Sequence, residues 1–300
     1  MDWQETKSFL APCFPQEVRD EFELLLPGEL QEIRVRAGQR CLLRTATRTA
    51  VLNWQPGRMQ VEALAEALCE HSLYARGDET RQGFVTLRGG HRMGLCGRMV
   101  PHGASRALKD VASVCIRIAC AWSGAADPLM PLCMKGGQPQ SLLIIGPPGS
   151  GKTSLLRDIA RQLAGGARPV QTAIIDERGE IAACVRGVPQ LDVGCTTDVI
   201  DRCPKEDALP MLVRAMAPQA IITDELASAA DVNAVMDAVA CGCAVIASIH
   251  GVSLRDAASR PVMAAMMAQR IFRHYAVLSP EGCGRIAAVH DYAGSPLRGG

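Results

Sequence analysis

A glycine-rich run near the middle of the chain has the residue types and spacing of a nucleotide phosphate-binding loop. Residues 146–154 read Gly-Pro-Pro-Gly-Ser-Gly-Lys-Thr-Ser, which fits the pattern Gly-x-x-x-x-Gly-Lys-[Ser/Thr]. Small residues let backbone N–H groups surround phosphate oxygens, the lysine reaches the β- and γ-phosphates, and the hydroxyl binds Mg²⁺. We expect Thr153 to be a metal ligand, and we expect phosphate contacts from Gly146, Pro147, Pro148, Gly149, Ser150, Gly151, Lys152, Thr153 and Ser154.

Two adjacent acids further along the chain have the positions that nucleotide hydrolysis needs. Asp224 and Glu225 follow Ala220-Ile-Ile-Thr223, a short apolar run typical of a buried strand. We expect Asp224 to hold Mg²⁺ through water and Glu225 to orient or deprotonate the attacking water. The alternative is that the pair only caps the helix that follows.

A second acidic stretch, Asp176-Glu-Arg-Gly-Glu180, ends the preceding apolar run. Either Glu177 or Glu180 could position the water or the metal, and the alternative is a solvated loop. Asp176-x-x-Gly179 also fits a short GTPase switch pattern. However, the guanine-reading motif Asn-Lys-x-Asp does not occur in the sequence, so ATP is favoured over GTP.

Histidine and arginine side chains complete the set of candidates. His250 ends the strand expected after Glu225 and could sense the γ-phosphate, or it could instead cap a helix or form a buried hydrogen bond. A cation from a neighbouring subunit can stabilise the transition state of phosphoryl transfer. The candidates for that cation are Arg92, Arg98, Arg117, Arg186 and Arg214, each of which could instead be a surface charge.

The elements around these residues predict a doubly wound α/β domain. The strand Ser141–Ile145 precedes the loop, and Leu155, Leu156, Ile159 and Leu163 follow at helical spacing until Gly165-Gly166. Apolar strands and helices then alternate, with a capping box at Ser228-x-x-Asp231 and a hairpin near the C-terminus, and ligands are expected at the strand carboxyl ends. Residues 1–125 predict a smaller α+β domain with a hairpin around Gly89-Gly90, and residues 126–300 predict the nucleotide domain.

Composition narrows the functional class. The chain of 300 residues is 48% hydrophobic and 21% charged, which is typical of a globular protein, and its formal net charge is +1. With aromatics at only 4%, these values weigh against a nucleic-acid partner. The 13 cysteines lack a Cys-x-x-Cys pair, so we expect reduced thiols in a cytoplasmic protein. No signal peptide or stretch of roughly 20 apolar residues is present, so membrane association would come through a partner.

Several stretches, in order along nearly the whole chain, resemble the stage III sporulation protein AA family. They begin with Glu32-Ile-Arg-Val-Arg, Arg81-Gln-Gly-Phe-Val-Thr-Leu and Gly90-His-Arg-Met-Gly-Leu-Cys-Gly. The phosphate loop with Leu-Leu-Arg-Asp, Ile175-Asp-Glu-Arg-Gly-Glu-Ile-Ala and Met211-Leu-Val-Arg-Ala-Met-Ala-Pro-Gln-Ala-Ile-Ile-Thr-Asp-Glu follow. The resemblance implies a RecA-like P-loop ATPase domain with a smaller N-terminal domain, related to type II and type IV secretion ATPases.

The resemblance also implies roles for particular residues. Asp176–Glu180 is similar to the acidic box of secretion ATPases, Ser248-Ile-His250 to their His box, and Arg117 lies where their N-terminal domain carries an arginine strand. Two features depart from pilus motors: the box reads Asp-Glu-Arg-Gly-Glu instead of Glu-Asp-Pro-x-Glu, and Leu226-Ala-Ser replaces the arginines after the second acidic motif.

At the level of the cell, the resemblance implies assembly into a homo-oligomer, a hexameric ring, and a role in endospore formation. The ATPase would dock from the mother-cell cytoplasm on membrane-embedded proteins of a sporulation channel. A RecA-like nucleic-acid motor and a low-turnover nucleotide-dependent structural subunit are the alternative hypotheses.

Overall fold

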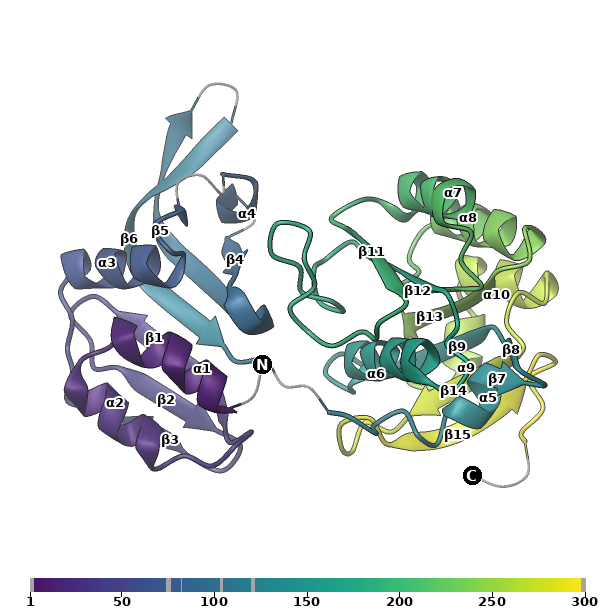
Figure 1. Ribbon diagram of the computed structural model, residues 1–300, viewed down its shortest axis with the longest axis horizontal. Coiled ribbons are helices and arrows are strands. Elements are labelled where there is room, and N and C mark those ends of the chain that lie inside the picture. The colour runs from purple at the N-terminus through teal and green to yellow at the C-terminus, as the bar shows by residue number, and fades with distance from the viewer. Residues whose placement is uncertain (1–2, 74–76, 82, 103–104, 120–121, 298–300) are drawn as a thin grey trace. The chain divides into compact units, whose positions relative to one another are not determined.

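The computed structural model describes residues 3–73, 77–81, 83–102, 105–119 and 122–297, which form two compact units (Figure 1). The first unit comprises residues 1–120 and 183–191, and the second comprises residues 121–182 and 192–300. The sequence division at residue 125 does not anticipate that residues 183–191, from within the second half of the chain, pack with the first unit.

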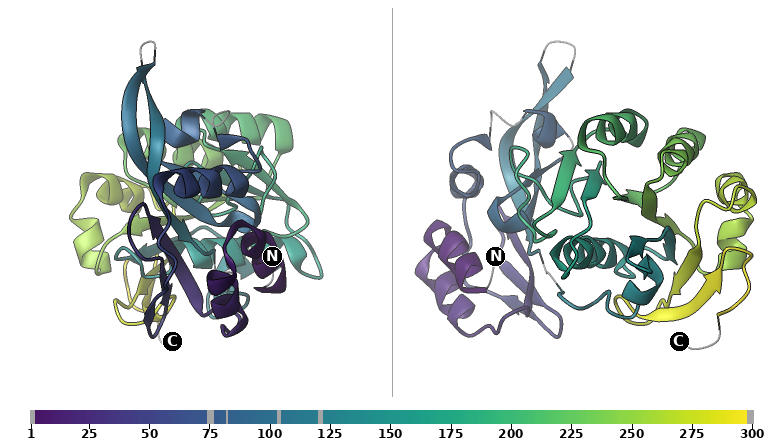
Figure 2. Two further views of the ribbon diagram at one scale, coloured as in Figure 1. Left: turned by 90° about the vertical axis from the view of Figure 1, so that its left-hand side faces the viewer. Right: turned by 45° about the vertical axis from the view of Figure 1, so that its right-hand side comes forward.

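The first unit contains a six-stranded antiparallel sheet in the order β3-β2-β1-β6-β5-β4. Strands β5 and β6 extend beyond the others as a long hairpin (Figure 2). The expected turn at Gly89-Gly90 is confirmed, because β4 and β5 pair antiparallel with Phe84 opposite Gly94. The strands are β1 Leu30–Arg36, β2 Leu42–Thr45, β3 Thr49–Val51, β4 Phe84–Thr86, β5 Arg92–His102 and β6 Ser105–Arg117.

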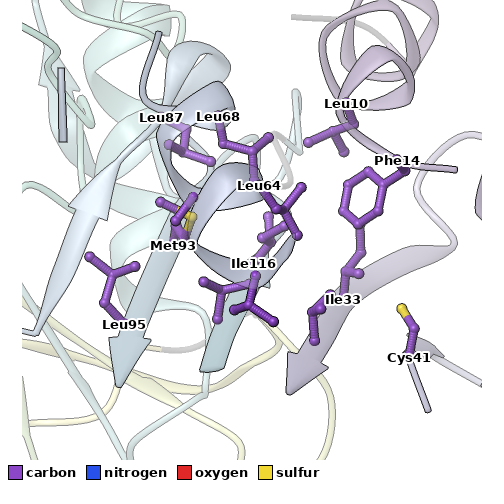
Figure 3. Packing of buried hydrophobic residues seen from close by; sticks show 14 of the residues in the cluster. Leu10, Phe14, Ile33, Cys41, Leu64, Leu68, Leu87, Met93, Leu95 and Ile116 are labelled. Atoms are coloured by element: carbon purple, nitrogen blue, oxygen red, sulfur yellow. The ribbon is translucent and has the colours of Figure 1, made fainter. Parts of the chain in front are cut away.

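Helices cover the apolar face of this sheet (Figure 3). The expected amphipathic helix is α3, Arg58–Leu68, whose Val61, Leu64 and Leu68 are buried against strand residues such as Ile33. Burial of each such side chain contributes about 2 kcal/mol before chain entropy is counted. The sequence did not predict the short helices α1 Trp3–Leu10, α2 Gln16–Glu23 and α4 Gly77–Arg81, or the 3₁₀ turns η1 Ala11–Cys13 and η3 Arg88–Gly90.

The second unit is built on a seven-stranded sheet in the order β11-β10-β12-β13-β9-β14-β15. Neighbouring strands are parallel except for β14 and β15, which form the expected C-terminal hairpin. The central strands are buried on both faces, which explains their uninterrupted apolar sequences. The strands are β9 Leu142–Gly146, β10 Thr172–Asp176, β11 Thr197–Asp201, β12 Ala220–Glu225, β13 Ala244–His250, β14 His274–Leu278 and β15 Ile286–Asp291, with the small pair β7 Met134–Lys135 and β8 Gln138–Pro139 beside them.

Helices lie on both faces of this sheet, as the alternation of elements predicted (Figures 1 and 2). Helix α6 covers one face, whereas α7, α8 and α10 pack with alternate strand residues in a core on the other face. The capping box is confirmed, since Ser228 accepts a hydrogen bond from the Asp231 amide at the start of α8. The helices are α5 Met130–Cys133, α6 Lys152–Gly165, α7 Lys205–Met216, α8 Ala229–Ala240, α9 Leu254–Ala258 and α10 Pro261–Ala268.

Three further observations bear on function. No helix in the described ranges is long and apolar enough to cross a membrane. All 12 cysteines that the structure describes are free, as expected. Within the same described residues, no group of three or more His, Cys, Asp or Glu side chains could hold a metal ion by itself.

Candidate nucleotide site

The glycine-rich loop connects the end of β9 to the start of α6, so the first turn of a helix faces the space where phosphates would lie. Gly149 and Gly151 have φ angles of +77° and +90°, a region that favours glycine. A Cβ at Gly146 would meet the Ser150 Oγ, and a Cβ at Gly151 would lie 2.7 Å from the Gly284 nitrogen. Packing therefore requires glycine at both ends of the motif, and at Gly151 the backbone conformation favours it as well.

Lys152 is buried, and its ammonium group is bound by the loop itself. The Nζ donates hydrogen bonds to the carbonyl oxygens of Gly146 at 2.8 Å and Pro147 at 2.9 Å. Burial lowers the pKa of this lysine, and the nearby Glu225 carboxylate opposes that shift. When a nucleotide binds, phosphate oxygens could replace these two carbonyl oxygens as hydrogen-bond acceptors of Lys152. This is the environment expected for a phosphate-binding lysine.

His250 connects Lys152 to Glu225 across the ends of three neighbouring strands. Lys152 Nζ lies 3.1 Å from His250 Nδ1, and His250 Nε2 lies 3.4 Å from Glu225 Oε2. Because an ammonium group can only donate, Nδ1 accepts and the ring proton is on Nε2, facing the carboxylate. The structure thus brings together three of the residues expected from the sequence: Lys152, Glu225 and His250.

Asp224 is buried next to a lysine that the sequence analysis did not single out. Its Oδ1 lies 3.3 Å from Lys205 Nζ, and Lys205, which is only 4% exposed, also contacts Glu177 Oε2 at 2.6 Å. Burial raises the pKa of Asp224 to about 6, and Lys205 opposes the shift. Apart from this ion pair, the buried Oδ1 has no hydrogen-bond partner among the residues that the structure describes. A metal ion at this position would share the carboxylate with the Lys205 ammonium, and the Mg²⁺ role of Asp224 stays a prediction.

The acidic stretch 176–180 divides into structural and site-facing residues. The buried Asp176 carboxylate accepts hydrogen bonds from the backbone N–H groups of Glu180, Ile181 and Ala182 at 2.8–3.0 Å and so fixes this turn. The Glu180 carbonyl accepts a hydrogen bond from Arg157, while its side chain is exposed. Arg178 reaches the site, with its Nη2 3.0 Å from Glu225 Oε2.

The basic partners of Asp224 and Glu225, which are Lys205 and Arg178, could not be found from motif spacing. Lys205 starts α7, just after β11, and meets Asp224 at the end of β12 because β11, β10 and β12 are consecutive in the sheet. Arg178 lies inside a stretch that drew attention for its carboxylates. A third addition is the β14–β15 turn, where the Gly284 N–H donates to the Ser150 carbonyl at 2.8 Å and so supports the loop.

The other loop residues and the arginine candidates are placed as follows. Pro148 and Gly149 are exposed, and Thr153 and Ser154 lie half-buried in the first turn of α6.

Arg117 belongs to β6 in the first unit, where its side chain is 68% exposed and lies 3.9 Å from Glu32. The remaining candidates are distributed over both units: Arg92 stacks on Phe84, Arg98 pairs with Asp110, Arg186 lies in the segment that packs with the first unit, and Arg214 is exposed on α7.

Solved structures of the ATPase DotB and of a pilus retraction motor share this fold. The ATPase DotB of Yersinia pseudotuberculosis matches with a TM-score of 0.61 at 14% identity, over 93% of this chain and 80% of that chain. DotB of Legionella pneumophila matches at 0.58 and 13% identity, over 88% of this chain and 77% of that chain. The pilus retraction motor PilT with bound ADP matches at 0.59 and 16% identity, over 87% and 76% of the two chains. The fold is therefore that of a RecA-like P-loop ATPase domain with an additional N-terminal domain.

Relatives found by sequence identify the family of this chain. Stage III sporulation protein AA of Bacillus subtilis (strain 168) is 38% identical over 274 residues, which covers 90% of this chain and 89% of the relative. The protein SEEDLING PLASTID DEVELOPMENT 1 of Arabidopsis thaliana is 30% identical over 159 residues, covering 52% of this chain and 22% of the plant protein. The family model described as sporulation stage III, protein AA matches residues 16–297. The chain therefore belongs to the stage III sporulation protein AA family.

Proposed function

We propose that this protein binds ATP with Mg²⁺ and hydrolyses it as a motor subunit that energises a membrane channel complex during endospore formation. The observation that carries the proposal is the chain of contacts from the phosphate loop through Lys152 and His250 to Glu225. These contacts connect the carboxyl ends of β9, β13 and β12, and ligands bind at the carboxyl ends of strands in open α/β sheets.

Each residue has a role in this proposal. The phosphates of ATP would replace the Gly146 and Pro147 carbonyls as partners of Lys152. Thr153 and Asp224 would hold Mg²⁺, which neutralises charge that develops on the phosphate oxygens. Glu225 would orient and deprotonate the attacking water, and His250 would report phosphate occupancy to Glu225 through the contacts of its two ring nitrogens.

The contacts of the Glu225 carboxylate support a second candidate function. Its Oε2 is shared by Arg178 and His250, so the base is engaged before any substrate arrives. A subunit in which this engagement persists after ATP binding would act as a low-turnover, nucleotide-dependent structural component. The rate of phosphate release at saturating ATP separates the two: a motor turns over many times, whereas a switch stops after about one phosphate per subunit.

Assembly is part of the proposal. The family membership and the fold shared with secretion and pilus ATPases support a homo-oligomer, with a hexameric ring as the proposed form and membrane-embedded sporulation channel proteins as partners. The proposed location is the mother-cell cytoplasm at the membrane. Arg117, exposed on β6, would supply a transition-state cation to a neighbour, and Glu180 would line the acidic box at the same site.

The experiment that tests assembly-dependent hydrolysis uses the full chain at a series of concentrations. Specific phosphate release should rise with protein concentration, because the arginine arrives only on assembly. Mixing Arg117→Ala subunits with Glu225→Gln subunits should restore part of the activity, since some interfaces then combine an intact base with an intact arginine. Flat specific activity on dilution, together with an inactive mixture, would contradict a role for Arg117 in a neighbouring site.

A further inference from the structure

A pocket of about 600 Å³ lies at the amino ends of strands in the second unit, at the opposite end of the sheet from the phosphate loop. Ser141, Ala244 and Arg273, which stand at or just before the starts of β9, β13 and β14, line it. Ile271, Val239 and the ring of Tyr292 supply apolar surface. Its volume is in the range of known ligand sites, and its mixed lining suits a ligand with both polar and apolar groups.

The charge of this pocket is positive and uncompensated. Its lining contains Arg270 and Arg273 and no acidic residue. Among the residues that the structure describes, no carboxylate lies within ion-pair distance of either guanidinium, as is also true of the exposed Arg214 and Arg255 outside the pocket. Arg270 and Arg273 differ from those residues because both line one pocket whose lining has no carboxylate, and this arrangement favours an anionic ligand.

Arg270 occupies a left-handed position at the end of a helix, beside the pocket. Helices α8 and α10 both end at this pocket with a left-handed residue, whose N–H bonds back to a helix carbonyl. In α8 that residue is Gly242 at φ +90°, the usual choice, but in α10 it is Arg270 at φ +51°. A residue with a Cβ is disfavoured there, but Ala217 takes the same conformation after α7, so this strain by itself assigns no role to the Arg270 side chain. Its guanidinium lies 5.3 Å from the centre of the Tyr292 ring, at the edge of the pocket.

The strands that begin at this pocket end at the nucleotide site. β9 runs from Leu142, just after Ser141, to Gly146, β13 runs from Ala244 to His250, and β14 leads into the turn whose Gly284 N–H supports Ser150. An occupant of the pocket would therefore contact the starts of the same three strands that carry the phosphate loop, the histidine and the loop support at their other ends.

We propose that the pocket is a docking site for an acidic peptide segment of a partner protein, with carboxylates paired to Arg270 and Arg273 and an apolar side chain against Ile271 and Val239. Planar guanidinium groups match carboxylates in bidentate pairs, and the apolar lining favours a peptide over a phosphate backbone. This docking site goes beyond the proposed ATPase function and does not depend on it.

The test measures peptide binding by the full-length chain in the absence of nucleotide. The probe is a fluorescent, acetylated and amidated hexapeptide, Glu-Leu-Glu-Glu-Leu-Glu, and its control replaces each Glu by Gln. Binding by fluorescence anisotropy is expected for the acidic peptide only, and Arg270→Gln/Arg273→Gln should weaken it by about tenfold or more. Arg214→Gln/Arg255→Gln removes the same charge from exposed positions outside the pocket and should bind as the wild type does.

A second variant separates binding from folding. Arg270→Gly places the favoured residue at the left-handed position, so its melting temperature should not fall while its affinity for the peptide drops. Equal binding of the Glu and Gln peptides, unchanged affinity in the double pocket variant, or no binding to the wild type at millimolar peptide would each overturn the proposal. Equally effective competition by succinate, by a single-stranded oligonucleotide or by unlabelled protein would also overturn it, because a small anion, nucleic acid or second copy would then be the occupant. Repeating the titration with Lys152→Ala keeps the result independent of ATP hydrolysis.

Discussion

Arg178→Gln is expected to raise the basal rate of ATP hydrolysis. In the nucleotide-free arrangement the Arg178 guanidinium lies 3.0 Å from Glu225 Oε2, and this ion pair must open before the carboxylate can accept a proton from water. The arginine side chain is 59% exposed and the glutamate 21%, so the pair contributes about 0.2–1 kcal/mol. Because about 1.36 kcal/mol is a factor of ten in rate, removing it should accelerate turnover roughly 1.5- to fivefold.

The assay is continuous phosphate release at saturating ATP, with ATP affinity measured separately by a fluorescent nucleotide. Arg178→Lys keeps a cation near Glu225 and should give an intermediate rate, whereas Arg255→Gln, an exposed arginine of the same unit, should leave the rate unchanged. A fall of tenfold or more in kcat for Arg178→Gln with unchanged ATP affinity would refute this reasoning. It would mean that Arg178 stabilises the transition state itself.

Three further predictions concern stability, measured by urea unfolding. Gly151→Ala should cost about 2–4 kcal/mol, because it adds left-handed strain and a Cβ 2.7 Å from the Gly284 nitrogen, whereas Gly149→Ala, with free space around it, should cost only about 1 kcal/mol. Lys205→Met should cost about 3 kcal/mol by leaving the buried Asp224 carboxylate without its cation, and a loss under 1 kcal/mol would contradict that pairing. Burial lowers the pKa of His91 to about 4, below its unfolded value of about 6.5. The free energy of unfolding should therefore be highest above pH 6.5 and should fall by about 2–4 kcal/mol as the pH drops towards 4, because the unfolded state then binds the proton more readily. His91→Gln should flatten that part of the pH profile.

The parts of the fold that are set by residues close together in the sequence could be predicted. The phosphate loop, its preceding strand and its following helix are contiguous, so residue spacing alone placed Lys152 at a helix start. The same holds for the capping box at Ser228 and for the C-terminal hairpin. Strand β11 was missed because all five of its residues are half-exposed at the sheet edge, so its sequence lacks an apolar run.

The parts that depend on tertiary pairing could not be predicted. Arg178 meets Glu225 only after β10 and β12 are paired, and Lys205 meets Asp224 only after β11 has also joined the sheet beside β10, so no spacing in the sequence encodes these contacts. The packing of residues 183–191 with the first unit likewise depends on contacts far apart in the chain, such as the Gly89 N–H bonded to the Gln190 side chain.

The central claim is ATP hydrolysis at the loop of residues 146–154, and its most direct test compares binding with turnover in three proteins. The wild type should bind ATP with Mg²⁺ and release phosphate repeatedly. Lys152→Ala should fold but bind ATP much more weakly and release none, because the cation between the loop carbonyls and His250 is lost. Glu225→Gln should bind ATP as the wild type does while hydrolysis falls strongly, because the amide cannot accept the proton. Wild-type turnover in pure Lys152→Ala, or equal loss of binding and turnover in Glu225→Gln, would contradict the account.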